Sequence, residues 1–324
     1  MLHVVTGGAG FLGSHLVDAL IERGDDVLIV DNLTTGNLRN VENATRSGRA
    51  AFVFLDVAQP VDVLRAALEA PLAGRKIDRI YHLASPASPD AYGNHPWETL
   101  LVNGLGTMSL IELALLHGAR FVYSSTSEIY GDPLVHPQPE SYFGNVDPIG
   151  PRACYDEGKR FGEAAISVAF AKSKLDARIV RFFNCYGPRM NAADGRLIPA
   201  LTEAVETGRP FPIHGDGRQT RSMTYVSDAI ALLLIVSDTS MDRLQPVNIG
   251  NDVENTVLEI AEAFARASNV PFTAQYEPAR EGDPKRRRPD LSVARTFPWN
   301  PKVSLDEGLA LSLAWSREVS PAYL

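Results

Sequence analysis

Tyr155 and Lys159 are the residues whose types and spacing most directly suggest chemistry. They stand four residues apart in a stretch expected to be helical, so both side chains should lie on one helical face. A lysine ammonium beside a tyrosine hydroxyl favours the phenolate and lowers the tyrosine pKa from about 10, which would give a base for a sugar hydroxyl. The spacing is common, and by itself it also fits an exposed helix with a solvated lysine. The interpretation therefore depends on the elements that position the pair.

Those elements alternate between short β-rich runs and amphipathic stretches. Alternation of this kind indicates crossover connections and predicts an α/β fold with a doubly wound parallel sheet. Strands are expected at residues 3–6, 27–31, 51–56, 79–83, 121–125 and 177–184. Helices are expected at residues 12–23, 61–70, 97–117, 155–172, 197–207, 227–236, 256–267 and 305–317.

A glycine-rich segment follows the first expected strand and opens the first expected helix. Its glycines allow the backbone to approach a pyrophosphate, and the helix N-terminus supplies amide donors. The residues of this segment that would contact a dinucleotide are Gly7, Gly10, Phe11, Leu12 and Gly13.

Two aspartates end the strands that follow. Asp31 has the spacing of a carboxylate that binds the adenosine ribose, and it would repel a 2'-phosphate, so NAD is predicted in preference to NADP. Asp56 either accepts a hydrogen bond from the adenine amine or caps its strand. We therefore expect an NAD-binding Rossmann domain at residues 1–184, to which the chain returns at about 222–250. A smaller α/β substrate-binding lobe is expected at residues 185–221 and 251–324.

Composition excludes several other classes. The chain has 324 residues, of which 45% are hydrophobic and 22% charged, and this is enough for a large core. A formal net charge of -8 argues against nucleic acid as the main partner. The longest apolar run, residues 229–236, is too short to span a bilayer, and no signal peptide is expected before residues 2–5. The two cysteines, Cys154 and Cys185, indicate neither a disulfide framework nor a metal site, so a cytoplasmic location is the expectation.

Thr126 completes a redox site, because hydride transfer also needs a donor that holds the developing oxyanion. The glycine-rich segment, Thr126 and the Tyr155–Lys159 pair, in this order and spacing, resemble the extended short-chain dehydrogenase/reductase superfamily, whose members modify nucleotide sugars. The resemblance covers nearly the whole chain. It implies further cofactor contacts at Asn32, Val57, Leu83 and Asn103.

Three longer strings, at residues 82–89, 125–133 and 148–159, are similar to the UDP-glucuronate decarboxylases. This resemblance implies that NAD oxidises the sugar C4 hydroxyl of UDP-glucuronate, that the β-keto acid loses carbon dioxide, and that C4 is reduced again to give UDP-xylose. It also implies that Ser127 and Glu128 lie against the sugar and its carboxylate, although Glu128 could instead buttress a turn. An arginine that assists decarboxylation maps to Arg287, with Arg286 and Arg288 as alternatives.

Further residues are candidates for holding the UDP-sugar. A guanidinium group can bind two phosphate oxygens at once, which favours arginines near the diphosphate. The candidates are Pro86, Tyr92, Asn184, Arg189, Arg221 and Arg280, of which Tyr92 could equally be a packing residue.

Two rival functions stay open. A 4-epimerase acting on a UDP-uronic acid, or another nucleotide-sugar epimerase or dehydratase, would share NAD, Tyr155 and Thr126. Ser127 weighs against a dehydratase, since those relatives carry an Asp-Glu pair after the threonine, whereas residues 280–283 look more like the epimerases. A non-catalytic NAD-binding regulatory protein would not need Thr126, Tyr155 and Lys159. By resemblance, helices 97–117 and 155–172 would form a homodimer interface, unless they pack within one chain.

Overall fold

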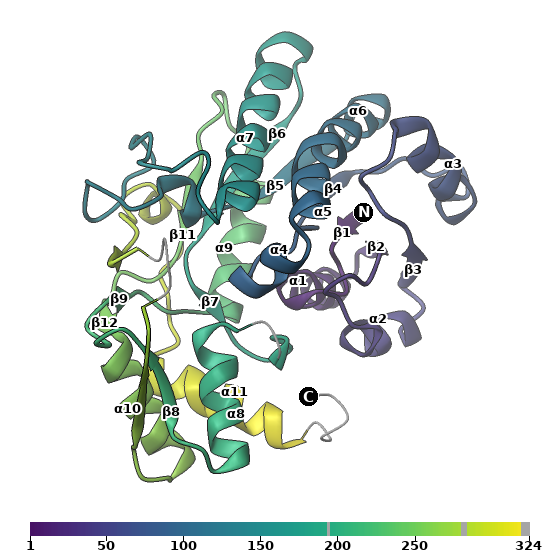
Figure 1. Ribbon diagram of the computed structural model, residues 1–324. Coiled ribbons are helices and arrows are strands. Elements are labelled where there is room, and N and C mark those ends of the chain that lie inside the picture. The colour runs from purple at the N-terminus through teal and green to yellow at the C-terminus, as the bar shows by residue number, and fades with distance from the viewer. Residues whose placement is uncertain (193–194, 280–283, 319–324) are drawn as a thin grey trace.

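The computed structural model describes residues 1–192, 195–279 and 284–318, and its main element is a seven-stranded parallel sheet (Figure 1). In spatial order the strands are β11 (Val247–Ile249), β6 (Ala177–Phe182), β5 (Arg120–Thr126), β4 (Arg79–His82), β1 (Leu2–Thr6), β2 (Asp26–Asp31) and β3 (Ala50–Phe54). The strand order reverses between β4 and β1, which is where such sheets open a crevice for ligands at their carboxyl edge. The predicted doubly wound α/β fold is confirmed.

Helices cover both faces of this sheet because successive side chains of each strand point to opposite sides. Val5 and Ile29 belong to one hydrophobic core, whereas their neighbours Val4 and Leu28 belong to the other. The first core is shared with α1 (Phe11–Glu22) and α9 (Val226–Asp238). The second is shared with α3 (Val61–Leu72), α6 (Thr107–His117) and α7 (Ala153–Ser173).

The helix expected at residues 97–117 is a continuous helical stretch in three parts. It consists of α5 (Pro96–Leu101), a π-helical turn at Val102–Gly106, and α6. The stretch Pro96–His117 has the length and mean hydropathy (1.6) of a membrane span, and 56% of its most apolar window is buried inside the protein. A core helix against a sheet has the same properties, and α6 packs on both the sheet and α7.

A smaller lobe lies beside the carboxyl edge of the sheet (Figure 1). Its helices are α8 (Leu197–Thr207), α10 (Val257–Ser268) and α11 (Leu305–Glu318). Its strand groups are β7 (Cys185–Tyr186) with β10 (Thr224–Tyr225), β8 (Phe211–His214) with β13 (Ala274–Glu277), and β9 (Thr220–Arg221) with β12 (Asn255–Thr256) and β14 (Arg286–Arg287). A capping box between Thr256 and Glu259 fixes the start of α10.

Between two passes through this lobe the chain returns to the sheet. Helix α9 covers one sheet face, and β11 pairs in parallel with β6, with Val247 opposite Val180. The short elements that were not predicted include the 3-10 turn Leu38–Val41, α2 (Glu42–Arg46) and α4 (Pro89–Asn94), together with the short strands β7 to β14. Each is too short to show a clear apolar period.

Candidate active site

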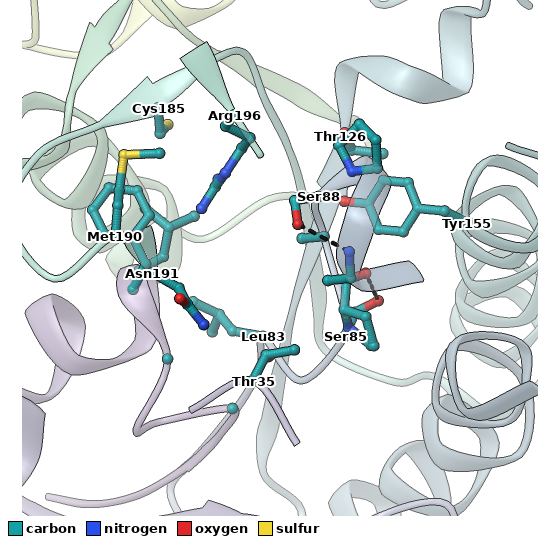
Figure 2. Close-up of a pocket in the computed structure, with 18 of the residues that line it drawn as sticks. Thr35, Leu83, Ser85, Ser88, Thr126, Tyr155, Cys185, Met190, Asn191 and Arg196 are labelled. Carbon is teal, nitrogen blue, oxygen red and sulfur yellow. Dashed lines mark hydrogen bonds between the residues drawn. The ribbon is translucent and has the colours of Figure 1, made fainter. Parts of the chain in front are cut away.

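A cavity of about 600 Å³ runs from the carboxyl ends of β1 and β2 to the smaller lobe. Figure 2 shows Thr126 and Tyr155 on one side of it, and Met190, Asn191 and Arg196 on the other. The glycine-rich segment and the catalytic pair, which are far apart in sequence, therefore open into one space.

The glycine-rich turn can be built only from residues without side chains at its tightest points. A Cβ atom on Gly13 would lie 2.1 Å from the carbonyl oxygen of Gly7, and one on Gly7 would lie 2.6 Å from the backbone nitrogen of Ala84. Gly7 also has a φ of +70°, which favours glycine. Helix α1 then begins without an acidic residue in its first turn, so its positive end is left for an anionic group. This cradle fits a dinucleotide diphosphate.

Asp31 has the geometry expected of a ribose-binding carboxylate. It is buried, and its two oxygens accept hydrogen bonds from the backbone nitrogens of Ala9 (2.9 Å) and Leu33 (2.8 Å). Burial raises the pKa of Asp31, and the two backbone hydrogen bonds oppose that rise. Each oxygen keeps a lone pair for a hydroxyl group, whereas a phosphate at this position would be repelled. The site thus fits NAD better than NADP.

The other predicted cofactor residues divide into two groups. Those that line the cavity are Gly7, Gly10, Phe11, Leu12, Gly13, Asn32, Asp56, Val57 and Leu83. Asp56 also accepts a hydrogen bond from the backbone nitrogen of Ala58 (2.8 Å). Asn103 does not line the cavity. It lies in the π-helical turn and donates to the Ser85 hydroxyl (2.9 Å), so it supports the wall through Ser85 rather than contacting a cofactor directly.

Tyr155 and Lys159 line the cavity, but the pKa of Tyr155 differs from the expectation. Tyr155 lies against Thr126 (Figure 2), and burial raises its pKa well above 10 despite a hydrogen bond to Thr126. Burial also lowers the pKa of Lys159 to about 7. The lysine Nζ donates to the carbonyl oxygen of Ser124 (2.8 Å) and lies 5.8 Å from the centre of the Tyr155 ring. The expected lowering of the Tyr155 pKa is wrong for the protein alone, because removal from water penalises the charged form of the phenol.

An ion pair with little solvent exposure links the helix that carries Tyr155 and Lys159 to the sheet. Glu163, one turn beyond Lys159, pairs with Arg181 at 2.7 Å and accepts a hydrogen bond from Ser125 at 2.5 Å. The pair ties α7 to β6 and to the end of β5, the strand that carries Thr126. Sequence analysis did not identify Glu163, since a lone acid on a helix gives no sign of its partner.

Glu128 is held between two arginines at the cavity wall. Its carboxylate contacts Arg287 at 2.6 and 3.0 Å and Arg152 at 2.7 Å. All three side chains line the cavity, and Thr126 accepts a hydrogen bond from the Glu128 backbone nitrogen at 3.2 Å. We call Glu128, Arg152 and Arg287 the arginine wall. Arg152 lies in the string at residues 148–159 that resembles the decarboxylases, but it was not predicted as a site residue.

The structure separates the three alternative arginines, of which Arg286 and Arg287 form β14 and Arg288 follows it. Arg287 is buried and faces the cavity, whereas the Arg286 side chain is 59% exposed and lies 3.7 Å from Glu254. Arg288 does not line the cavity, and its backbone nitrogen donates to Gln138. The parallel pairing of β14 with β9 sets this register, with Arg287 opposite Arg221.

The predicted substrate residues also divide. Pro86, Ser127, Asn184, Arg189 and Arg221 line the cavity, and Arg280 lies outside the described residues. Arg189 is attached to α1 through Asp18 (2.7 Å), and its Nη1 is buried without a hydrogen-bond partner among the described residues. Such a donor suits a phosphate oxygen.

Tyr92 does not line the cavity. Its ring stacks on Tyr155 with centroids 5.2 Å apart, and the Arg152 guanidinium lies 6.0 Å from the ring centre. The packing alternative for this residue therefore describes its position better than the substrate contact, because α4 carries it behind the catalytic tyrosine.

Sequence comparison gives a family. Residues 3–250 match the model of the NAD dependent epimerase/dehydratase family. UDP-glucuronic acid decarboxylase 1 of Arabidopsis thaliana is 44% identical over 94% of this chain and 67% of its own length. UDP-glucuronic acid decarboxylase 1 of Danio rerio is 41% identical over 98% of this chain and 73% of its own length.

Solved structures agree with this assignment. UDP-glucose 4-epimerase of Thermotoga maritima, solved with UDP-glucose, matches with a TM-score of 0.88 at 29% identity, over 98% of this chain and 99% of that one. UDP-glucuronic acid 4-epimerase of Bacillus cereus, solved with NAD and UDP-4-deoxy-4-fluoro-glucuronic acid, matches with a TM-score of 0.85 at 27% identity, over 98% of this chain and 99% of that one. NAD is therefore the cofactor, and the glycine-rich turn and Asp31 have the geometry to hold it. The chain belongs to the NAD-dependent epimerase/dehydratase family and is similar over nearly its whole length to UDP-glucuronic acid decarboxylases.

Proposed function

We propose that this protein converts UDP-glucuronate to UDP-xylose and carbon dioxide. The observation that carries the proposal is the arginine wall, which stands beside Thr126 and Tyr155 in the same cavity. The phenol and the threonine act on a sugar hydroxyl, and two guanidinium groups within reach of the same sugar suit a carboxylate. Glu128 neutralises only one of the two guanidinium charges, so a neutral hexose would leave the arginine wall with a net charge of plus one.

The first step is removal of the C4 hydroxyl proton by Tyr155, with the Thr126 hydroxyl holding the oxygen in place. When bound, NAD would supply the acceptor and later the donor of the C4 hydride, and its positive charge in the oxidised state would favour the Tyr155 phenolate. Lys159 lies below the Tyr155 ring, and in its protonated state it adds to the same effect.

The oxidised sugar is a β-keto acid, so its C5 carboxylate can leave as carbon dioxide. The electron pair of the broken C5–carboxylate bond moves onto the C4 oxygen, where Thr126 and Tyr155 stabilise the enolate. Arg287 and Arg152 orient the carboxylate before it leaves, and Glu128 fixes both guanidinium groups. A proton from water then adds to C5, and C4 is reduced as Tyr155 returns its own proton to O4.

Incubation of the purified protein with UDP-glucuronate, followed by mass analysis of the nucleotide sugar, tests this function. We expect a product lighter by the mass of carbon dioxide. A product of unchanged mass but different retention would instead indicate a UDP-uronic acid 4-epimerase. Unaltered substrate, with NAD bound, would indicate a binding protein without this activity.

We also infer that the protein forms a homodimer through α5, α6 and α7. The continuous stretch α5–α6 exposes Trp97, Leu101, Leu105 and Met108 on one face. Phe161 and Val168, two turns apart on α7, are 47% and 63% exposed. Helices α5 and α7 lie side by side (Figure 1). Their exposed apolar side chains can therefore form a continuous surface. Contiguous apolar surface of this kind is typical of a subunit interface.

A cytoplasmic location is a further proposal. Both cysteines, Cys154 and Cys185, are free thiols, which suits a reducing compartment. Fractionation of the source cells with an antibody against the protein tests it, and recovery outside the cytoplasmic fraction would contradict it.

A further inference from the structure

Asp156 is a buried acid that the proposed mechanism does not use, and it lies four residues after Arg152 of the arginine wall, to whose carbonyl oxygen its backbone nitrogen donates (3.1 Å). It follows Tyr155 in the first turn of α7 and is 6% exposed. Its Oδ1 is buried without a hydrogen-bond partner among the described residues. A carboxylate in such a position is costly when it is ionised. The fold keeps this acid at a cost in stability, which points to a functional role.

The surroundings of Asp156 are mostly charged. Burial has the largest influence on this carboxyl and, together with the charge of Glu128, raises its pKa to about 7, while Arg152 and Arg287 oppose the rise. The charge of Glu157, on the same helix, also raises the pKa of Asp156, but by less than the charge of Glu128. The charged and titratable groups that interact with Asp156 come from four elements. Glu128 lies in the 3-10 turn Ser127–Tyr130, Arg287 in β14 and Tyr92 in α4. The others lie at the start of α7: Arg152, Cys154, Tyr155 and Glu157.

The charge of this cluster depends on whether Asp156 is protonated. The two guanidinium groups of the arginine wall and the Glu128 carboxylate sum to a charge of plus one. With Asp156 protonated, an arriving uronate carboxylate brings the four groups and the ligand to neutrality. With Asp156 ionised, the same ligand leaves an excess negative charge in a buried place, which is unfavourable.

We propose that Asp156 is a positioning residue that takes up a proton when a carboxylate-bearing sugar nucleotide binds, and so matches the arginine wall to an acidic sugar. The inference rests on the proposed function, which supplies the carboxylate. One proton moves from solvent to the Asp156 carboxylate, and no bond of the sugar changes. Asp156 acts through Arg152 and Arg287, because it does not itself line the cavity.

Proton uptake on binding tests the proposal directly. The holoenzyme carrying Tyr155→Phe holds UDP-glucuronate without turnover and is titrated in weakly buffered solution with a pH indicator. A pH of about 8 lies one unit above the Asp156 pKa of about 7 in the ligand-free protein. At this pH, binding of UDP-glucuronate should take up a substantial fraction of a proton per site, approaching one. UDP-glucose, which lacks the carboxylate, should bind with no uptake.

A second pair of variants separates Asp156 from other acids. Adding Asp156→Asn to Tyr155→Phe should abolish the uptake, because the amide cannot titrate. The matched control is Glu157→Gln, which removes a neighbouring charge from a side chain that is 39% exposed, and it should leave the uptake unchanged. Uptake that persists in Asp156→Asn, or that is equal with UDP-glucose, would overturn the proposal.

The pH dependence of affinity tests the same inference without the Asp156 variant. The dissociation constant of UDP-glucuronate should rise above pH 7 by up to about tenfold per pH unit, whereas that of UDP-glucose should stay level. A level profile for both ligands would refute the role of Asp156. Failure of the proposed function looks different: the wild-type protein would then release no carbon dioxide at any pH. Carbon dioxide release without proton uptake on binding would contradict only the role of Asp156.

Discussion

Removal of the Arg287 guanidinium should slow decarboxylation more than C4 oxidation. Arg287 makes two contacts with Glu128, at 2.6 and 3.0 Å, and one with Asn184 at 3.3 Å, and its side chain is only 9% exposed. A hydrogen bond to a charged group contributes about 1.5–3 kcal/mol, so Arg287→Ala should reduce the rate of carbon dioxide release by about 10- to 150-fold. Oxidation at C4 depends on Thr126 and Tyr155, which Arg287 does not touch.

The assay follows both events in one sample. Carbon dioxide release reports decarboxylation, and the near-ultraviolet absorbance of the reduced cofactor reports C4 oxidation. In Arg287→Ala the absorbance should build up and a 4-keto uronic acid nucleotide should appear, whereas the wild type should accumulate neither. Arg286→Ala is the matched control, because this neighbouring cation is exposed and outside the cavity. Its rates should stay near those of the wild type.

Equal losses of oxidation and carbon dioxide release in Arg287→Ala would refute this reasoning and make Arg287 a binding residue only. A loss in Arg286→Ala as large as that in Arg287→Ala would refute the register of β14. Thermal melting of each variant shows whether the loss comes from unfolding, since Glu128 loses one of its two arginine partners. Arg287→Lys keeps the charge but not the two-pronged contact, and it should fall between the wild type and Arg287→Ala.

Tyr155→Phe should lower the rate of C4 oxidation by about 10²- to 10⁴-fold, the usual contribution of a general base, while binding of UDP-glucuronate measured by calorimetry persists; an unchanged turnover would exclude Tyr155 as the base. Asp31→Ser should weaken NAD and improve NADP binding, measured as dissociation constants, because the carboxylate that repels a 2'-phosphate is gone; unchanged selectivity would place the ribose elsewhere. Trp97→Glu with Met108→Glu should shift the protein to a monomer in light scattering, since both side chains are more than half exposed on one helical face, and a dimer that persists would refute the interface. Asp156→Asn should raise the melting temperature above pH 7 but not near pH 4: the folded pKa of about 7 lies above the usual 3.8, so the acid costs stability as pH rises from about 4 to about 7, where the unfolded chain ionises and the folded protein does not, and a difference that does not depend on pH would contradict this.

Much of the sheet and of the cofactor site could be predicted from sequence. Regular alternation of strands and helices predicts the sheet, and the glycine spacing with Asp31 predicts the NAD site, because each depends on local residue order. Short elements such as α4 escaped prediction, since six residues show no clear period. The direction of the Tyr155 pKa shift was wrong, because the degree of burial depends on the whole fold.

Contacts between distant segments could not be predicted. The arginine wall joins residues 128, 152 and 287 through the pairing of β14 with β9, and a run of four cations gives no sign of which one is buried. Asn103 and Tyr92 were predicted to contact the cofactor and the substrate, but the structure has both outside the cavity lining. Spacing along the sequence does not give the direction of a side chain. Asp156 was not predicted as a site residue, since an acid in the first turn of a helix is common and its sequence position gives no sign of burial.

The most direct test of the central claim is the reaction of UDP-glucuronate in heavy water, with the product analysed by nuclear magnetic resonance. If one site oxidises C4, releases carbon dioxide and reduces C4 again, the product is UDP-xylose with one deuterium at C5. Its C4 position should carry the hydrogen that the substrate brought, and no reduced cofactor should accumulate. A hexuronic acid product without deuterium at C5, or solvent deuterium at C4, would contradict the account.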